Sequence, residues 1–199
     1  MSRKVFDIIT SAGGAVIVVT LLIAGGFLTW GYTFARSNVR DQLAQQQIYF
    51  PPQAAFAHPK AGTEITPSMI PSVSQFAGQQ LLSGEQAKVY ANDFIKVHLS
   101  EMPYGGVYSK ASAAALKDPT NTKLQGVVQT IFKGTTLRGL LLEAYAFSTI
   151  ATIMLYGAIA SFILAAILAM LVGLGFWHAH RTSEETEMLR PQTKAVPAS

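Results

Sequence analysis

The stretch Tyr156–Gly173 reads YGAIASFILAAILAMLVG, and it decides the fold class because no charged side chain interrupts it. It lies inside a longer charge-free run, residues 144–177, and a second such run covers residues 8–35. A helix needs about 20 apolar residues to cross the hydrocarbon layer of a bilayer. Both runs are long enough, so the sequence predicts two transmembrane helices.

Small side chains recur at every fourth position of this stretch. We refer to Gly157, Ser161, Ala165, Ala169 and Gly173 as the small-residue stripe. Such spacing lets two helix backbones approach closely inside a membrane, where lipid supplies no hydrophobic drive for association. The stripe therefore predicts a helix-packing surface. Two partners fit it equally well: the first predicted span of this chain, or a helix of another subunit.

The composition agrees with a membrane protein. Half of the residues are hydrophobic and 13% are charged, about half the charged share of a typical soluble domain. The chain has no cysteine, which excludes disulfides, thiolate catalysis and cysteine-ligated metal centres. The net charge of +4 is spread thinly, so we expect no nucleic-acid partner.

The charges that flank the spans predict the orientation. Arg3 and Lys4 precede the first span, and His178, His180 and Arg181 follow the second. Positive charge on short flanks favours the cytoplasmic side. We therefore expect both termini in the cytoplasm and the central region outside the plasma membrane. The first apolar run exceeds the 7–15 residues typical of a signal-peptide core, so we interpret it as an uncleaved anchor.

The predicted fold class is all-α, with two transmembrane helices flanking a small helical extracytoplasmic domain. The predicted boundaries are 1–7 for a cytoplasmic N-terminus, 8–33 for the first transmembrane helix, 34–143 for the extracytoplasmic domain, 144–177 for the second transmembrane helix, and 178–199 for a cytoplasmic tail.

Local signals predict how the first span begins and continues. Gly13–Gly14 and Gly25–Gly26 allow close approach by another helix. Beyond the membrane, residues 36–47 are polar and contain no helix breaker before Pro51–Pro52. The first helix should therefore continue past the bilayer. Five of the nine prolines then fall within residues 51–71, which predicts irregular chain.

Further helices follow this irregular segment. Ser83 and Gln86 fit a capping box at the start of an amphipathic helix over Gly84–Glu101. A short helix is expected over Ser109–Lys117. Gly134 fits a C-terminal cap, so we expect the last helix to begin near Thr136 and run to about His178.

Few side chains offer chemistry. Glu143 directly precedes the second charge-free run; it is either a contact or proton-handling carboxylate in the membrane, or a carboxylate just above it, and we favour the second. His178 and His180 lack further metal ligands nearby in sequence, so we interpret them as interfacial residues. His98 lies beside an apolar helix face and is expected to be packed. We predict no catalytic, cofactor-binding or metal-binding residue, and no enzyme activity.

Four segments carry a resemblance to a known group of proteins: MSRKVFDIIT, QLAQQQIYFPP, AGQQLLSGEQAKVYANDFIKVHL and TLRGLLLEAYAF. The chain resembles small two-span membrane proteins of unknown function from actinobacteria, and the resemblance covers most of it outside the tail. Members often carry the label of aromatic ring-opening dioxygenase. No His/His/carboxylate facial set supports that label here. Some proteins of this type resemble accessory subunits of the cytochrome bcc–aa3 respiratory supercomplex.

These observations favour a non-catalytic accessory subunit of a larger membrane complex, with the bilayer and other integral subunits as partners. The bcc–aa3 supercomplex is the assembly that the resemblance implies. The alternative is a lipid-binding or small-ligand-binding sensor module outside the membrane. That alternative predicts an apolar cavity between the capped helix and the segment PPQAAFAHPK, residues 51–60.

Overall fold

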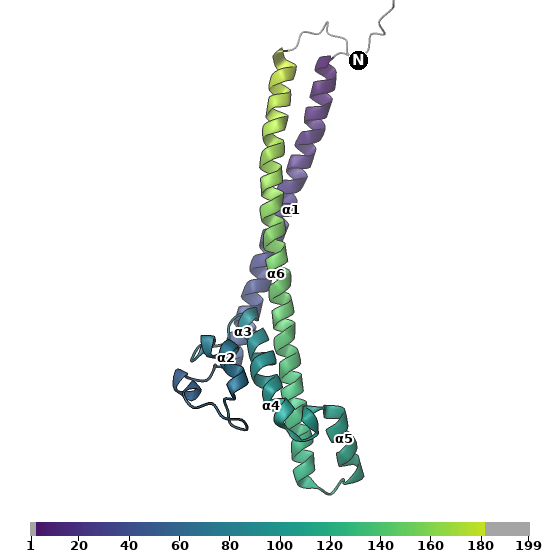
Figure 1. The fold of residues 1–199 in the computed structure, drawn as a ribbon. Coiled ribbons are helices and arrows are strands. Elements are labelled where there is room, and N and C mark those ends of the chain that lie inside the picture. Colours follow the sequence, from purple (N-terminus) through teal and green to yellow (C-terminus); the bar gives the residue numbers. More distant parts are fainter. Residues whose placement is uncertain (1–2, 182–199) are drawn as a thin grey trace, which may run out of the picture. The chain divides into compact units, whose positions relative to one another are not determined.

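The fold, known from a computed structural model that describes residues 3–181, is all-helical (Figure 1). No strand occurs in that range; the one β-type contact is an isolated antiparallel bridge between Tyr49 and Gln80. The chain divides into two compact units. The helix-pair unit contains the described parts of Met1–Trp30 and Met154–Ser199, and the central unit is Gly31–Ile153.

Six α-helices and five short helical turns of other types make up the described chain. In order they are α1 (Arg3–Gln46), η1 (Gln53–Phe56), η2 (Pro67–Met69), α2 (Ile70–Val73), η3 (Ser74–Phe76), α3 (Gly84–Val89), the π-helical turn η4 (Tyr90–Ile95), α4 (Lys96–Glu101), η5 (Pro103–Gly106), α5 (Tyr108–Lys117) and α6 (Thr122–Arg181).

Two of these helices, α1 and α6, are long and apolar enough to cross a membrane, as the sequence predicted. α1 continues beyond its apolar part to Gln46, also as predicted. It stops where Gln47 adopts a positive φ of 51°, a conformation that an L-residue cannot repeat as a helix. The proline-rich segment that follows contains only short turns.

The predicted start of the last helix is wrong. α6 begins at Thr122 rather than near Thr136, and Gly134 lies inside it instead of capping an earlier helix. The Asn121 side chain supplies the cap, because its Oδ1 accepts a hydrogen bond from the Leu124 N–H at 3.0 Å. Gly134 has a packing role: a Cβ there would lie 2.8 Å from Cδ2 of Leu99.

The central unit has its own hydrophobic core. Its fully buried side chains include Phe50, Met69, Val73 and Leu81, and they pack with residues of α1, α3, α4 and α6. A ladder of rings runs through this core, with centroid distances of 4.6–5.3 Å between successive members. The ladder consists of Phe76, Phe50, Tyr90, Phe94 and His98.

The predicted capping box is confirmed at the start of α3. The Gln86 backbone N–H donates to Ser83 Oγ at 3.3 Å, and the Ser83 N–H donates to Gln86 Oε1 at 3.1 Å. The helix predicted over Gly84–Glu101 is present as α3, η4 and α4, with one π-helical turn in its middle. His98 is packed as expected, with its ring against Phe94.

Two glycines of the central unit are required by close backbone approach. A Cβ on Gly84 would collide with the side chain of Ser148 and lie 3.3 Å from Cα of Tyr145, so α3 starts directly against α6. Gly106 has a φ of +67°, and a Cβ there would collide with the backbone carbonyl of Leu99. Gly84 therefore sets how α3 packs on α6, and Gly106 sets how η5 packs on α4.

A candidate interaction surface on the helix pair

The two helices of the helix-pair unit bury positions that repeat every seven residues. On α1, the buried or half-buried positions include two sets, Lys4, Ser11, Val18 and Gly25, and Asp7, Gly14, Leu21 and Leu28. On α6, the matching sets are Ala158, Ala165, Val172 and Ala179, and Met154, Ser161, Leu168 and Gly175. A sustained seven-residue repeat is typical of a left-handed coiled coil.

Small residues on one helix face larger ones on the other along this interface. A Cβ on Gly14 would lie 2.6 Å from Cγ2 of Val172, and one on Gly25 would lie 2.9 Å from the ring of Phe162. In the opposite direction, a Cβ on Gly157 would lie 3.2 Å from Cδ1 of Leu28. The close approach expected at the two glycine pairs of α1 therefore occurs at one glycine of each pair.

Polar groups occupy one end of this interface. Ser11 is buried, and a Cβ on Gly175 would collide with its hydroxyl oxygen. One turn earlier on α1, Oδ2 of Asp7 lies 3.9 Å from Nε2 of His178. That oxygen is buried and makes no hydrogen bond among the described residues.

The small-residue stripe does not stay on this interface. Ala165 is buried, Gly157 and Ser161 are half-buried, and Ala169 and Gly173 are exposed. The cause is geometric. Each residue turns an α-helix by about 100°, so every fourth residue advances by about 40° and four such steps amount to about 160°. The first three members therefore face α1, and the last two face away from it.

The remaining surface of both helices is apolar on all sides. Exposed large side chains on α1 include Ile9, Val16, Ile23 and Phe27, and those on α6 include Tyr156, Ile163, Met170 and Leu174. A helix that is hydrophobic all round needs lipid or other protein around it. This surface is suited to a bilayer and to helices embedded in it.

The other predicted positions are Glu143, in the central unit, and His178 and His180, in the helix-pair unit. Glu143 is exposed on the central unit. Arg138, the nearest cation in sequence, donates to Oδ1 of Asn92 at 2.9 Å. Within residues 3–181, no group of three or more His, Cys, Asp or Glu side chains is placed to hold a metal ion, and this includes His178 and His180.

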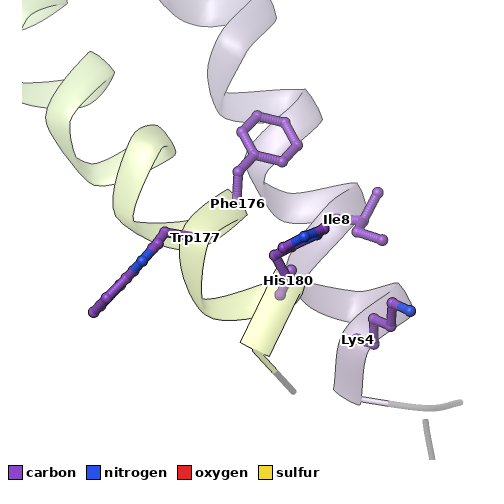
Figure 2. A pocket seen from close by; sticks show the side chains of 6 residues that line it. Lys4, Ile8, Phe176, Trp177 and His180 are labelled. Atoms are coloured by element: carbon purple, nitrogen blue, oxygen red, sulfur yellow. The ribbon is translucent and has the colours of Figure 1, made fainter. Parts of the chain in front are cut away.

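Two open grooves lie on the surface of the helix-pair unit. One follows α1 at Ile23, Gly26, Phe27 and Trp30. The other lies between the ends of α1 and α6 and is shown in Figure 2. In the central unit, Phe56 from the segment PPQAAFAHPK is 8% exposed and packs into the core. This part of the segment therefore contributes to the core of the central unit.

Sequence reasoning missed the register of the pair. The sequence contains the seven-residue repeat as small residues at Ala158, Ala165 and Ala179. The four-residue repeat of the small-residue stripe covers the same segment and is more regular, so it hides the seven-residue repeat.

No protein-family model, no curated protein and no solved structure matches the chain.

Proposed function

We propose that the protein is a non-catalytic accessory subunit of a larger membrane protein complex. In this account α1 and α6 cross the plasma membrane as a pair, with both termini in the cytoplasm and the central unit on the outer side. The pair anchors the chain and presents one face to an integral partner subunit. The central unit contacts parts of the complex outside the bilayer.

One observation carries the proposal: two of the five residues of the small-residue stripe remain exposed after α1 and α6 have paired. Ala169 and Gly173 are one turn apart on α6 and both are exposed. A Cβ on Gly173 would meet nothing within 4 Å. Small side chains weaken contact with lipid but let another helix backbone approach and gain dispersion contact. A second helix, from another subunit, is the partner that makes use of them.

Unused glycines on α1 support the same conclusion. Added Cβ atoms at Gly13 and Gly26 would also meet nothing within 4 Å, although each sits next to a glycine that contacts α6. Gly26 lies in the open groove with Phe27 and Trp30, which are 69% and 65% exposed. Glycine between large exposed apolar side chains provides a recess for a knob from a neighbouring helix.

The resemblance to actinobacterial two-span proteins favours the cytochrome bcc–aa3 respiratory supercomplex as the assembly. An accessory subunit of such a complex needs no reaction centre of its own. The dioxygenase label is not adopted, because the described residues offer no set of ligands for the iron that such chemistry uses.

Co-purification tests the proposal. The tagged full-length protein is extracted from its native membrane in a mild detergent, and its companions are identified and quantified by mass spectrometry. We expect stoichiometric integral membrane subunits. Matched variants sharpen the test: Gly173→Leu should reduce partner recovery several-fold, whereas Leu171→Ala, on the opposite side of α6, should leave it unchanged. Recovery of the wild-type chain alone would contradict the proposal.

A further inference from the structure

We propose that the groove between the ends of α1 and α6 binds the headgroup of an anionic phospholipid. The groove is lined by Lys4, Ile8, Phe176, Trp177, Ala179 and His180. This site is separate from the face proposed for a partner subunit. It requires only that the helix pair is embedded in a bilayer, with this end at the membrane surface.

The shape of the groove places an apolar floor beside a polar rim. Figure 2 shows His180 between the two helix ends, with Ile8 and Lys4 on the α1 side of the groove. Ile8 and Phe176 are 42% and 42% exposed. An acyl chain can lie along these apolar side chains while its headgroup remains level with Lys4 and His180.

The charges at this end favour an anion. Lys4 lines the groove, and Arg181 lies beside it with Cζ 4.3 Å from the centre of the Trp177 ring. The carboxylate at this end, Asp7, lies 3.9 Å from His178, is 18% exposed, and is not part of the groove lining. Among residues 3–181, Lys4 and Arg181 therefore lie at the groove, whereas the carboxylate of Asp7 lies near His178 and outside the groove lining.

The combination of cation, aromatic ring and groove identifies a lipid headgroup as the ligand. Tryptophan favours the interface between hydrocarbon and headgroups, because its ring is amphipathic. Basic pockets between transmembrane helices, at this depth, bind anionic lipid headgroups. A phosphate attached to acyl chains satisfies both the rim and the apolar floor, whereas a free phosphate ion satisfies only the rim.

Brominated lipids test the site, because bromine quenches tryptophan fluorescence at short range. The chain has two tryptophans, so Trp30→Phe leaves Trp177 as the sole reporter. The full-length variant is reconstituted into phosphatidylcholine vesicles that contain a minor share of brominated phosphatidylglycerol or, separately, brominated phosphatidylcholine. We expect the anionic lipid to be enriched around Trp177 by about fivefold at low salt, the factor expected for one basic side chain near an anionic lipid surface. Added salt should reduce this enrichment.

Two controls separate a built site from general attraction. Lys4→Gln combined with Arg181→Gln should reduce the enrichment to near unity. The same number of charges removed from exposed positions of the central unit, with Lys110→Gln and Lys117→Gln, should preserve it. Circular dichroism checks that both variants keep their helices.

A second reporter completes the test. Trp177→Phe leaves Trp30 to report on the opposite end of the first span, where we expect a smaller preference. Equal quenching of Trp177 by the two brominated lipids would overturn the proposal. So would an equal preference at Trp30, or enrichment that survives loss of Lys4 and Arg181. Inorganic phosphate added at matched ionic strength should leave the quenching by brominated phosphatidylglycerol unchanged. Loss of that quenching would show that the groove prefers the free ion, and it would also overturn the proposal.

Discussion

Adjacent glycines on α1 provide a matched test of the register in which α1 and α6 pair. A Cβ on Gly14 would lie 2.6 Å from Cγ2 of Val172, whereas a Cβ on the neighbouring Gly13 would meet nothing within 4 Å. Valine is stiff because it is branched at Cβ, so the backbones of the two helices must move apart to accept alanine at position 14. Alanine at position 13 requires no movement.

The expected magnitude follows from this difference. Replacing glycine by alanine in a helix interior changes intrinsic propensity by up to about 1 kcal/mol, and this contribution is common to both variants. Overpacking a well-filled interface costs about 1–3 kcal/mol. Gly14→Ala should therefore be less stable than Gly13→Ala by about 1–3 kcal/mol.

The assay is unfolding of the full-length protein by sodium dodecyl sulfate in mixed micelles. The free energy of separation of the helices is compared between the two variants under identical conditions. Gly25→Ala and Gly26→Ala repeat the test about three helical turns farther along α1, with a smaller difference expected because the facing ring of Phe162 is 41% exposed and has room to rotate. Equal stability of Gly13→Ala and Gly14→Ala, within about 0.5 kcal/mol, would refute the pairing register.

Three further predictions concern the central unit. Gly106→Ala should lower the melting temperature, measured by circular dichroism, more than Gly105→Ala: both residues have positive φ, near +67° and +61°, but only at Gly106 would a Cβ collide with a backbone carbonyl. Gln86→Ala should destabilise the protein by about 1–3 kcal/mol in chemical unfolding, because two backbone N–H groups lose their acceptor; an unchanged stability would contradict this. Burial, and secondarily the charge of Glu64, raises the pKa of Tyr90 above its ordinary value of 10.0, so the stability contribution of neutral Tyr90 is present below pH 10 and lost as pH rises further; Tyr90→Phe should flatten the fall in stability above pH 10.

The sequence alone predicts those elements that depend on interactions between residues close together in the chain. Length and lack of charge are enough to identify α1 and α6 as helices that can cross a membrane, and a two-residue exchange of hydrogen bonds makes the start at Ser83 recognisable. The helix of α1 beyond the apolar run was also predictable, since nothing in residues 36–46 breaks it.

Features that depend on tertiary contacts could not be predicted from the sequence. Gly134 matched the residue type of a helix cap, but it is a glycine because Leu99 packs against it. The π-helical turn at Tyr90–Ile95 adds a residue to one turn, and no local signal marks it. The contact of Gly134 joins α4 to α6 and is therefore visible only in the structure.

The small-residue stripe was recognised, but its division was not. A four-residue repeat suggests a single face in the sequence, but its members advance by about 40° per step around a helix. Only the arrangement of α1 shows that Ala165 lies on the paired side and Gly173 on the open side. The first three residues of the stripe pack against α1, and the last two are open to another partner.

Photo-crosslinking in intact cells tests the central claim most directly. A short diazirine amino acid is placed at Gly173 in one variant and at Leu171 in another; these exposed positions lie at similar depth but about 160° apart around α6. The account predicts a discrete crosslink to a second integral membrane protein from position 173 and none from position 171. Crosslinks to lipid alone from position 173, or the same protein adduct from both positions, would contradict it.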